Sequence, residues 1–182
     1  MSIITLDEAK NYLRVDSADD NALITSLIES AEDLVEKFTW RTLLTKTFEL
    51  VYDSVGESIE IPKSPLQEVT KIEVISDAGT KTEVSSSTYV VDITGSRGRV
   101  MLKSGCVWPS HRGFASFIIT AKAGYGDLAA SVPAALKQAI LAALAALYSV
   151  RGGAVDSYGR PIEAAVSSSI SGICAAYMVI RL

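Results

Sequence analysis

Two kinds of periodicity meet in AGYGDLAASVPAALKQAI, residues 123–140, and the fold class can be inferred from this change. Before it, apolar and polar residues alternate as in β-strands, and after it apolar residues recur as in a helix. The glycines Gly124 and Gly126 lack the lysine and the spacing of a phosphate-binding loop, and Asp127 would repel an anion. We therefore interpret the two glycines as hinge residues at the end of a strand.

A helix is predicted to follow the hinge and to run to about residue 150. Ser131 is expected to be its N-cap, and Pro133 to lie in its first turn, where a missing N–H costs nothing. Apolar residues cover almost its whole circumference, with Lys137 and Gln138 as the chief exceptions. Such a helix is buried on more than one side. It is either a core helix under the sheet or a helix partly covered by neighbouring subunits.

Residues 42–126 form the predicted antiparallel β region. Alternation and β-branched residues, broken by Gly and Pro, indicate strands at 45–52, 58–61, 69–76, 81–84, 89–92, 99–102 and 116–123. Asp77-Ala78-Gly79 is typical of a hairpin turn. Pro62 and Pro65 favour an extended connection or a sheet edge.

Residues 1–41 predict a helical hairpin. Thr5 and Glu8 have the spacing of a capping box, so a short helix is expected to begin there. The acidic linker 15–20 is expected to end this helix and to cap a longer one, whose apolar residues recur at the 3.6-residue period up to about residue 38.

Residues 151–182 are predicted to be a loop and a C-terminal docking tail. Residues 164–180 carry no charge over 17 positions, yet serines and a glycine interrupt them. This segment is too polar for a membrane and too apolar for a free tail, so it should dock on its own core or on a partner. The predicted fold is therefore α+β, with a hairpin (1–41), a β region (42–126), a core helix (127–150) and a loop with tail (151–182) in one compact structural unit.

Length and composition suit a globular protein without a membrane partner. The chain has 182 residues, of which 48% are hydrophobic. Its longest nearly apolar run, 139–150, is well short of the roughly 20 residues that span a bilayer. The N-terminus lacks the basic start and apolar core of a secretory signal, so we expect the chain to stay in the cytosol.

Charge is unevenly distributed along the chain, whose net charge is −4. Residues 1–36 hold nine acids and two bases, whereas residues 93–126 hold five bases and no acid. The two segments are either solvated faces of opposite sign or surfaces for head-to-tail self-association. On the second interpretation, the inter-subunit charge contacts are Asp19, Asp20, Glu29, Asp33, Arg97, Arg99 and Arg112.

Catalytic motifs are not found in the sequence. A nucleophile elbow, an HExxH helix and a Walker loop are all missing, and His111 is the chain's one histidine. Cys106 and Cys174 are expected to be free thiols, since two distant cysteines make neither a disulfide framework nor a zinc site. We expect no enzyme activity, cofactor or metal, although a hydrolase with spatially paired carboxylates stays open.

A ligand-binding module is the main alternative. A small-ligand or carbohydrate-binding β module with helical flanks would need a concave aromatic site, formed by Trp108, Phe114 and Tyr125. The same three residues would otherwise pack in a core.

The order of these features resembles the head-tail connector, or adaptor, proteins of long-tailed phages and of phage-like and gene-transfer particles. The resemblance lies in residues 4–50, in IPKSPLQEVTKIEVISDAG (61–79), in VWP (107–109), in TAKAGYGDLAASVPAALKQAILAALAALY (120–148) and in GICAAYMVIRL (172–182). The chain departs from the family pattern at Trp40, where a small residue is usual, and at Met178, where an arginine often follows the tyrosine.

The resemblance implies a non-enzymatic ring, commonly of twelve subunits, beneath the portal at one capsid vertex. Such a ring extends the DNA channel and offers a platform for the stopper or tail. The protein would be made in the host cytoplasm and would belong to the virion at the head-tail junction. DNA would pass through it without being read in sequence.

The resemblance also implies that the C-terminal segment reaches the portal. This assigns docking to Ile173, Tyr177, Ile180, Arg181 and Leu182. Deleting residues 164–182 is then expected to abolish docking and to leave the fold cooperative.

Overall fold

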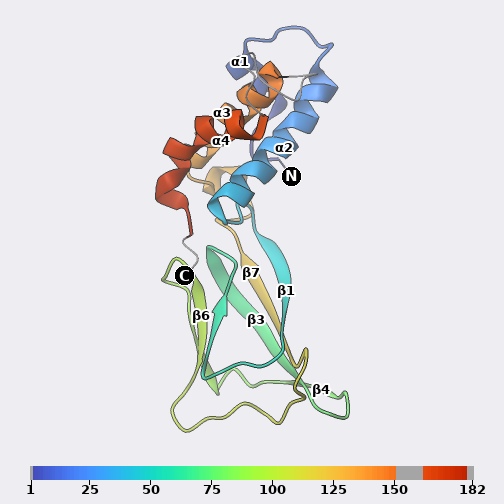
Figure 1. The fold of residues 1–182 in the computed structure, drawn as a ribbon, viewed down its shortest axis with the longest axis vertical. Helices are drawn as coiled ribbons and strands as arrows, with labels where there is room; N and C mark the ends of the chain where they lie inside the picture. Colours follow the sequence, from blue (N-terminus) through green and yellow to red (C-terminus); the bar gives the residue numbers. More distant parts are fainter. Residues whose placement is uncertain (1, 151–161, 180–182) are drawn as a thin grey trace. The chain divides into compact units, whose positions relative to one another are not determined.

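The computed structural model describes residues 2–150 and 162–179 (Figure 1). Its α+β fold confirms the prediction of terminal helices around an antiparallel β region. The chain divides into two compact units, one of residues 1–43 and 126–182 and one of residues 44–125. We call them the helical unit and the β unit. That the four predicted segments behave as one compact structural unit stays a prediction.

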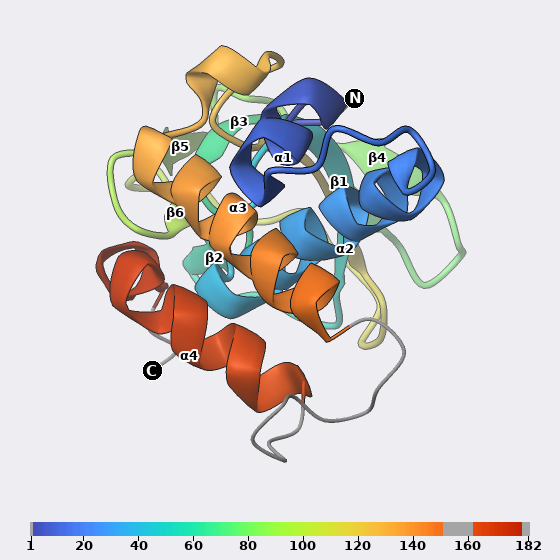
Figure 2. The same ribbon diagram turned by 90° about the horizontal axis from the view of Figure 1, so that it is seen from above.

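The helical unit is built from the N-terminal and the C-terminal parts of the chain. Its elements are α1 (Leu6–Leu13), α2 (Asn21–Thr39), the 3₁₀ helix η1 (Ala129–Ser131), α3 (Ala134–Ser149), α4 (Ile162–Cys174) and the 3₁₀ helix η2 (Ala175–Tyr177). Helix α3 packs against α1, α2 and α4, and Figure 2 shows it between α2 and α4.

Neighbouring helices explain the apolar sequence of α3. Its buried residues face more than one direction and are Leu136, Ala139, Ile140, Leu141, Ala143 and Leu144. Because α1, α2 and α4 all pack on this helix, helices of the same unit supply its core contacts. The ends of the chain therefore fold together around the segment that follows the glycine hinge.

Of three predicted helix caps, the one at Thr5 is confirmed in full, the one at the end of the acidic linker in position only, and the one at Ser131 is wrong. Thr5 and Glu8 form the complete capping box of α1. Ser131, however, ends η1, and Pro133 is the N-cap of α3 without a side-chain cap, because the chain makes a 3₁₀ turn before the helix starts. Asp20 is the N-cap residue of α2, but its side chain makes no cap hydrogen bond; its carboxylate accepts a 2.6 Å hydrogen bond from the Tyr148 hydroxyl.

The β unit contains all seven predicted strands. They are β1 (Lys46–Tyr52), β2 (Ser58–Ile61), β3 (Leu66–Ile75), β4 (Lys81–Glu83), β5 (Tyr89–Asp92), β6 (Gly98–Leu102) and β7 (Phe117–Ala123). They form a four-stranded sheet in the order β1-β7-β3-β4 and a three-stranded sheet in the order β2-β6-β5, with every pair antiparallel.

One apolar core holds the two sheets together. Phe117 and Ile119 of β7 lie in the same buried cluster as Ile59 of β2 and Val100 of β6. Residues that alternate with these along each strand point to the other face of their sheet. The outer face of the three-stranded sheet is thereby available for a site.

Candidate functional site

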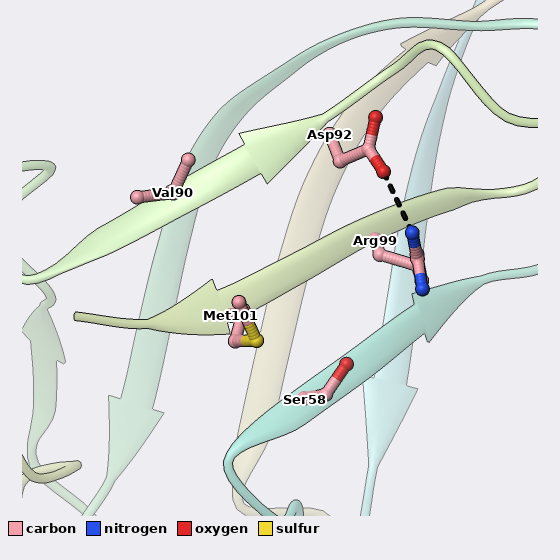
Figure 3. A pocket seen from close by; sticks show the side chains of 5 residues that line it. All are labelled: Ser58, Val90, Asp92, Arg99 and Met101. Carbon is pink, nitrogen blue, oxygen red and sulfur yellow. Dashed lines mark hydrogen bonds and ion pairs between the residues drawn. The ribbon is translucent and has the colours of Figure 1, made fainter. Parts of the chain in front are cut away.

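A pocket of about 110 Å³ opens on the outer face of the three-stranded sheet (Figure 3). In the strand register Met101 of β6 lies opposite both Ser58 of β2 and Val90 of β5, and Arg99 of β6 lies opposite Asp92 of β5. These five residues line the pocket. Val90 is 51% exposed and Met101 56% exposed, so two apolar side chains face solvent beside an ion pair.

The ion pair at this pocket is fixed by a hydrogen-bond network. Hydrogen bonds from the side chain and amide of Thr94, and then from Arg99, lower the pKa of Asp92 to about 2. The Arg99 Nη2 atom lies 2.9 Å from the Asp92 carboxylate. Asp92 therefore stays ionised at neutral pH, and Arg99 is held at the edge of the pocket.

The structure places the three predicted basic contact residues in internal interactions. Arg99 pairs with Asp92, and Arg97 pairs with Glu60 at 2.7 Å. Arg112 donates to the carbonyls of Phe114 and Ala115. Acidic residues of the neighbouring strands β2 and β5 therefore pair with two arginines of residues 93–126.

Pairing between strands removes the charge contrast that the sequence suggested. The β unit has nine acidic and nine basic residues, so its net charge is zero, and the whole charge of −4 belongs to the helical unit. The expectation of a separate basic part is therefore not met, because strand pairing brings together charges that are distant in sequence.

The predicted acidic contact residues differ in their surroundings. Asp19, Glu29 and Asp33 are exposed, and Asp33 pairs with Lys37 one turn further along α2 at 3.1 Å. Asp20 is half-buried and accepts the hydrogen bond from Tyr148. A role for any of these side chains between subunits stays a prediction.

The described part of the predicted docking tail packs on its own helical unit. Ile170 and Cys174 of α4 are buried, and the Val179 amide donates to the Thr39 carbonyl at 3.1 Å. Ile173 and Tyr177 are half-buried. The other predicted docking residues, Ile180, Arg181 and Leu182, lie outside the described residues.

The aromatic residues of the ligand-binding alternative have separate surroundings. Trp108 packs edge-on against Phe117, with ring centroids 5.5 Å apart, whereas Phe114 is 73% exposed. Tyr125 is half-buried after β7. None of the three lines the pocket, whose Val90 and Met101 escaped the sequence interpretation. The sequence feature that could have revealed Val90 and Met101 is an apolar residue at a strand position that alternation predicts to face solvent.

Side chains with potential for catalysis or metal binding serve in packing. His111 packs edge-on against Phe117 with centroids 4.8 Å apart, and burial raises the pKa of the Cys174 thiol. The described ranges contain no group of three or more His, Cys, Asp or Glu residues that could hold a metal ion. Over the same ranges, no helix has the length and apolar character needed to cross a bilayer.

Solved structures share this fold over nearly the whole chain. A structure described as the neck of an empty GTA particle, computed with C6 symmetry, matches with a TM-score of 0.73, 20% identity, and coverage of 99% of this chain and 91% of that one. A virion of a native gene transfer agent (GTA) particle matches with a TM-score of 0.75, 20% identity and the same coverage.

A third structure, the neck of a native GTA particle computed with C12 symmetry, matches with a TM-score of 0.72 and 21% identity over 97% of this chain and 89% of that one. No curated protein matches the chain. Residues 3–104, more than half of the sequence, match the family model described as Phage gp6-like head-tail connector protein. The chain therefore belongs to the Phage gp6-like head-tail connector family.

Proposed function

We propose that this protein is a structural, non-enzymatic adaptor that forms a ring beneath the portal of a virion or gene-transfer particle. The ring would extend the DNA channel and offer a platform for the stopper or tail. The observation that carries the proposal is the shared fold: 97–99% of the chain is covered by structures of particle necks and of a virion. The two neck structures were computed with sixfold and twelvefold symmetry, and we infer a twelvefold ring here.

Heterologous contacts suit such a ring. A head-to-tail contact between two different surfaces closes into a ring when its rotation closes. Both units carry exposed apolar side chains that could contribute, among them Trp40 and Leu128 in the helical unit and Val90 and Met101 in the β unit.

Light scattering of the full chain, alone and with portal protein, tests the ring. We expect oligomers of one defined size in at least one of the two conditions. A purified monomer would be compatible with the proposal if it joined a ring on the portal. A protein that stays monomeric and never binds portal would contradict it.

DNA is proposed to pass through the ring without tight binding. The β unit is neutral and the helical unit carries −4, so neither unit attracts DNA through its net charge, and only local Lys and Arg contacts with phosphates are expected. Fluorescence anisotropy with a labelled duplex should show weak binding that disappears between about 50 and 200 mM salt. Tight, sequence-dependent binding at the higher salt concentration would contradict this part of the proposal.

The C-terminal segment is proposed to dock on the portal beyond Val179. The described tail is held on the helical unit up to that residue, because Thr39 and Arg41 bond to the backbone of Val179 and Tyr177. We infer that Ile180, Arg181 and Leu182, which follow directly, supply the portal contact. Ile173 and Tyr177 would then position this end of the chain.

A further inference from the structure

One exposed aromatic side chain stands on a firmly anchored loop. The loop between β6 and β7 packs at its base through Trp108, whose ring meets Phe117 and whose Nε1 donates to the Gly56 carbonyl at 2.8 Å. The Arg112 amide donates to the carbonyl of Ile75 at the end of β3. Phe114, by contrast, is 73% exposed. An ordered loop therefore presents an apolar ring to solvent.

The backbone around Phe114 is held in one conformation. Arg112 donates to the Phe114 carbonyl at 2.7 Å and to the Ala115 carbonyl at 2.9 Å. Ala115 has φ +46, a left-handed conformation unfavourable for a residue with a Cβ, and its amide is fixed by the Asp53 carboxylate at 3.0 Å. The Ser116 hydroxyl also donates to the Asp53 carbonyl. Such strain concentrates at functional sites, and a ring fixed in advance loses little freedom on binding.

We propose that Phe114 of one subunit inserts into the pocket of the next subunit, between Val90 and Met101. This inference rests on the proposed ring and identifies one of its contacts. The pocket measures about 110 Å³ and is open to solvent, so a side chain of another subunit can enter it from outside.

The chemistry of the pocket suits an aromatic ring. Val90 and Met101 supply exposed apolar surface, and a methionine sulfur contacts aromatic rings favourably. Arg99 is held at the edge by Asp92, where its guanidinium can meet the ring's negative face. An exposed aromatic side chain and a fixed cation thus complement each other.

The positions of Phe114 and the pocket favour a contact between subunits. Phe114 stands beside the ends of β1 and β3, through Asp53 and Ile75, whereas the pocket lies on the outer face of the three-stranded sheet. Because two different surfaces of one unit are complementary, the contact is heterologous and repeats from subunit to subunit.

Cross-linking between marked subunits tests the contact and leaves Phe114 in place. Gly113→Cys puts a thiol beside Phe114 at a position where a Cβ meets nothing within 4 Å, and Ser58→Cys puts one at the exposed edge of the pocket. Both are made in a Cys106→Ser background and co-expressed, and the full-length protein is treated with a short bismaleimide, alone and with portal. Gly113→Cys co-expressed with Thr25→Cys, an exposed position of α2, controls for collision.

The expected result is a cross-linked dimer from the Gly113→Cys and Ser58→Cys mixture only. Each variant alone should give none, because a head-to-tail contact does not bring identical residues together. Adding Phe114→Ala should raise the dissociation constant of the oligomer at least about tenfold and remove the cross-link, whereas Val107→Ala, the 82% exposed neighbour on the same loop, should not.

Two other results are distinguishable. Oligomers seen by light scattering without this cross-link would overturn the Phe114 contact and leave the ring proposal standing. Failure of every variant and of the wild type to assemble, even with portal, would contradict the ring and this inference together.

Discussion

The Arg41 Nε atom donates a 2.6 Å hydrogen bond to the backbone carbonyl of Tyr177, 136 residues further along the chain. Beside it, the Val179 amide donates to the Thr39 carbonyl. The two bonds fasten the segment after α4 to the end of α2. Ala175, Ala176 and Met178 of this segment are exposed, and Val179 at its end is buried.

Arg41→Ala should therefore loosen the tail more than it destabilises the unit. A hydrogen bond from a charged group contributes about 1.5–3 kcal/mol, and we expect a loss within that range in the free energy of unfolding by urea. Chymotrypsin should cut after Tyr177 faster in the variant. Arg14→Ala, an exposed arginine at the end of α1, is the matched control and should change neither measurement. Unchanged cleavage in Arg41→Ala would show that the bond does not hold the tail.

Truncation should leave the fold intact at one cut point and destabilise it at another. Removing residues 180–182 leaves every described contact of the tail in place, so the melting temperature should stay unchanged while portal binding weakens. Removing residues 164–182 takes Ile170 and Cys174 out of the core, which corrects the expectation of a cooperative fold after this deletion. Since losing a large core side chain costs about 2–5 kcal/mol, calorimetry should show a broad, low-temperature transition. A sharp, wild-type transition would refute this account of α4.

Gly124 should tolerate alanine much less well than Gly126. Gly124 has φ +139, and a Cβ there would lie 2.6 Å from the backbone of Leu44 and Thr45, which cannot move aside. At Gly126, φ +153, the obstacles are the Ser131 hydroxyl at 2.5 Å, which can rotate, and the Ser131 Cβ at 2.7 Å, which belongs to a short 3₁₀ turn rather than to paired strand backbone. We expect Gly124→Ala to lose about 2–4 kcal/mol and Gly126→Ala about 1–2 kcal/mol in urea unfolding. Equal losses of unfolding free energy in the two variants would mean that the positive φ, and not the nearness of other atoms, sets the cost of alanine at both positions.

Local patterns were sufficient for much of this fold. The capping box of Thr5 and Glu8 and the alternation of each strand act within a few residues, and both appear in the structure where the sequence predicts them. The glycine hinge was also visible, because a chain that changes from strand to helix needs backbone freedom. Long-range pairing was not visible. Arg97 pairs with Glu60, from a strand more than 30 positions earlier, and such pairs offset the positive charge that residues 93–126 carry in the sequence.

The pocket could not be predicted for the same reason. Ser58, Val90 and Met101 become neighbours only when β2, β6 and β5 pair in register. Phe114 could be noticed as an aromatic residue, but its exposure depends on the bonds that Arg112 and Asp53 make around it. The residue type of Ser131 predicts a cap, but no cap motif in the sequence signals the 3₁₀ turn before Pro133.

The capping box of α1 should make stability depend on pH with a defined sign. Bonds from the Thr5 backbone and hydroxyl lower the pKa of Glu8 below its ordinary value of about 4.3, so the folded state favours the ionised form. This contribution is fully present above the unfolded pKa and is lost as pH falls through the folded one. Gln at the same position keeps a capping partner but does not titrate. The advantage of wild type over Glu8→Gln in urea unfolding should therefore be constant from pH 7 to 5 and shrink below pH 4, only modestly because Glu8 is exposed. An advantage that grows in acid would show that the carboxylate is protonated in the box.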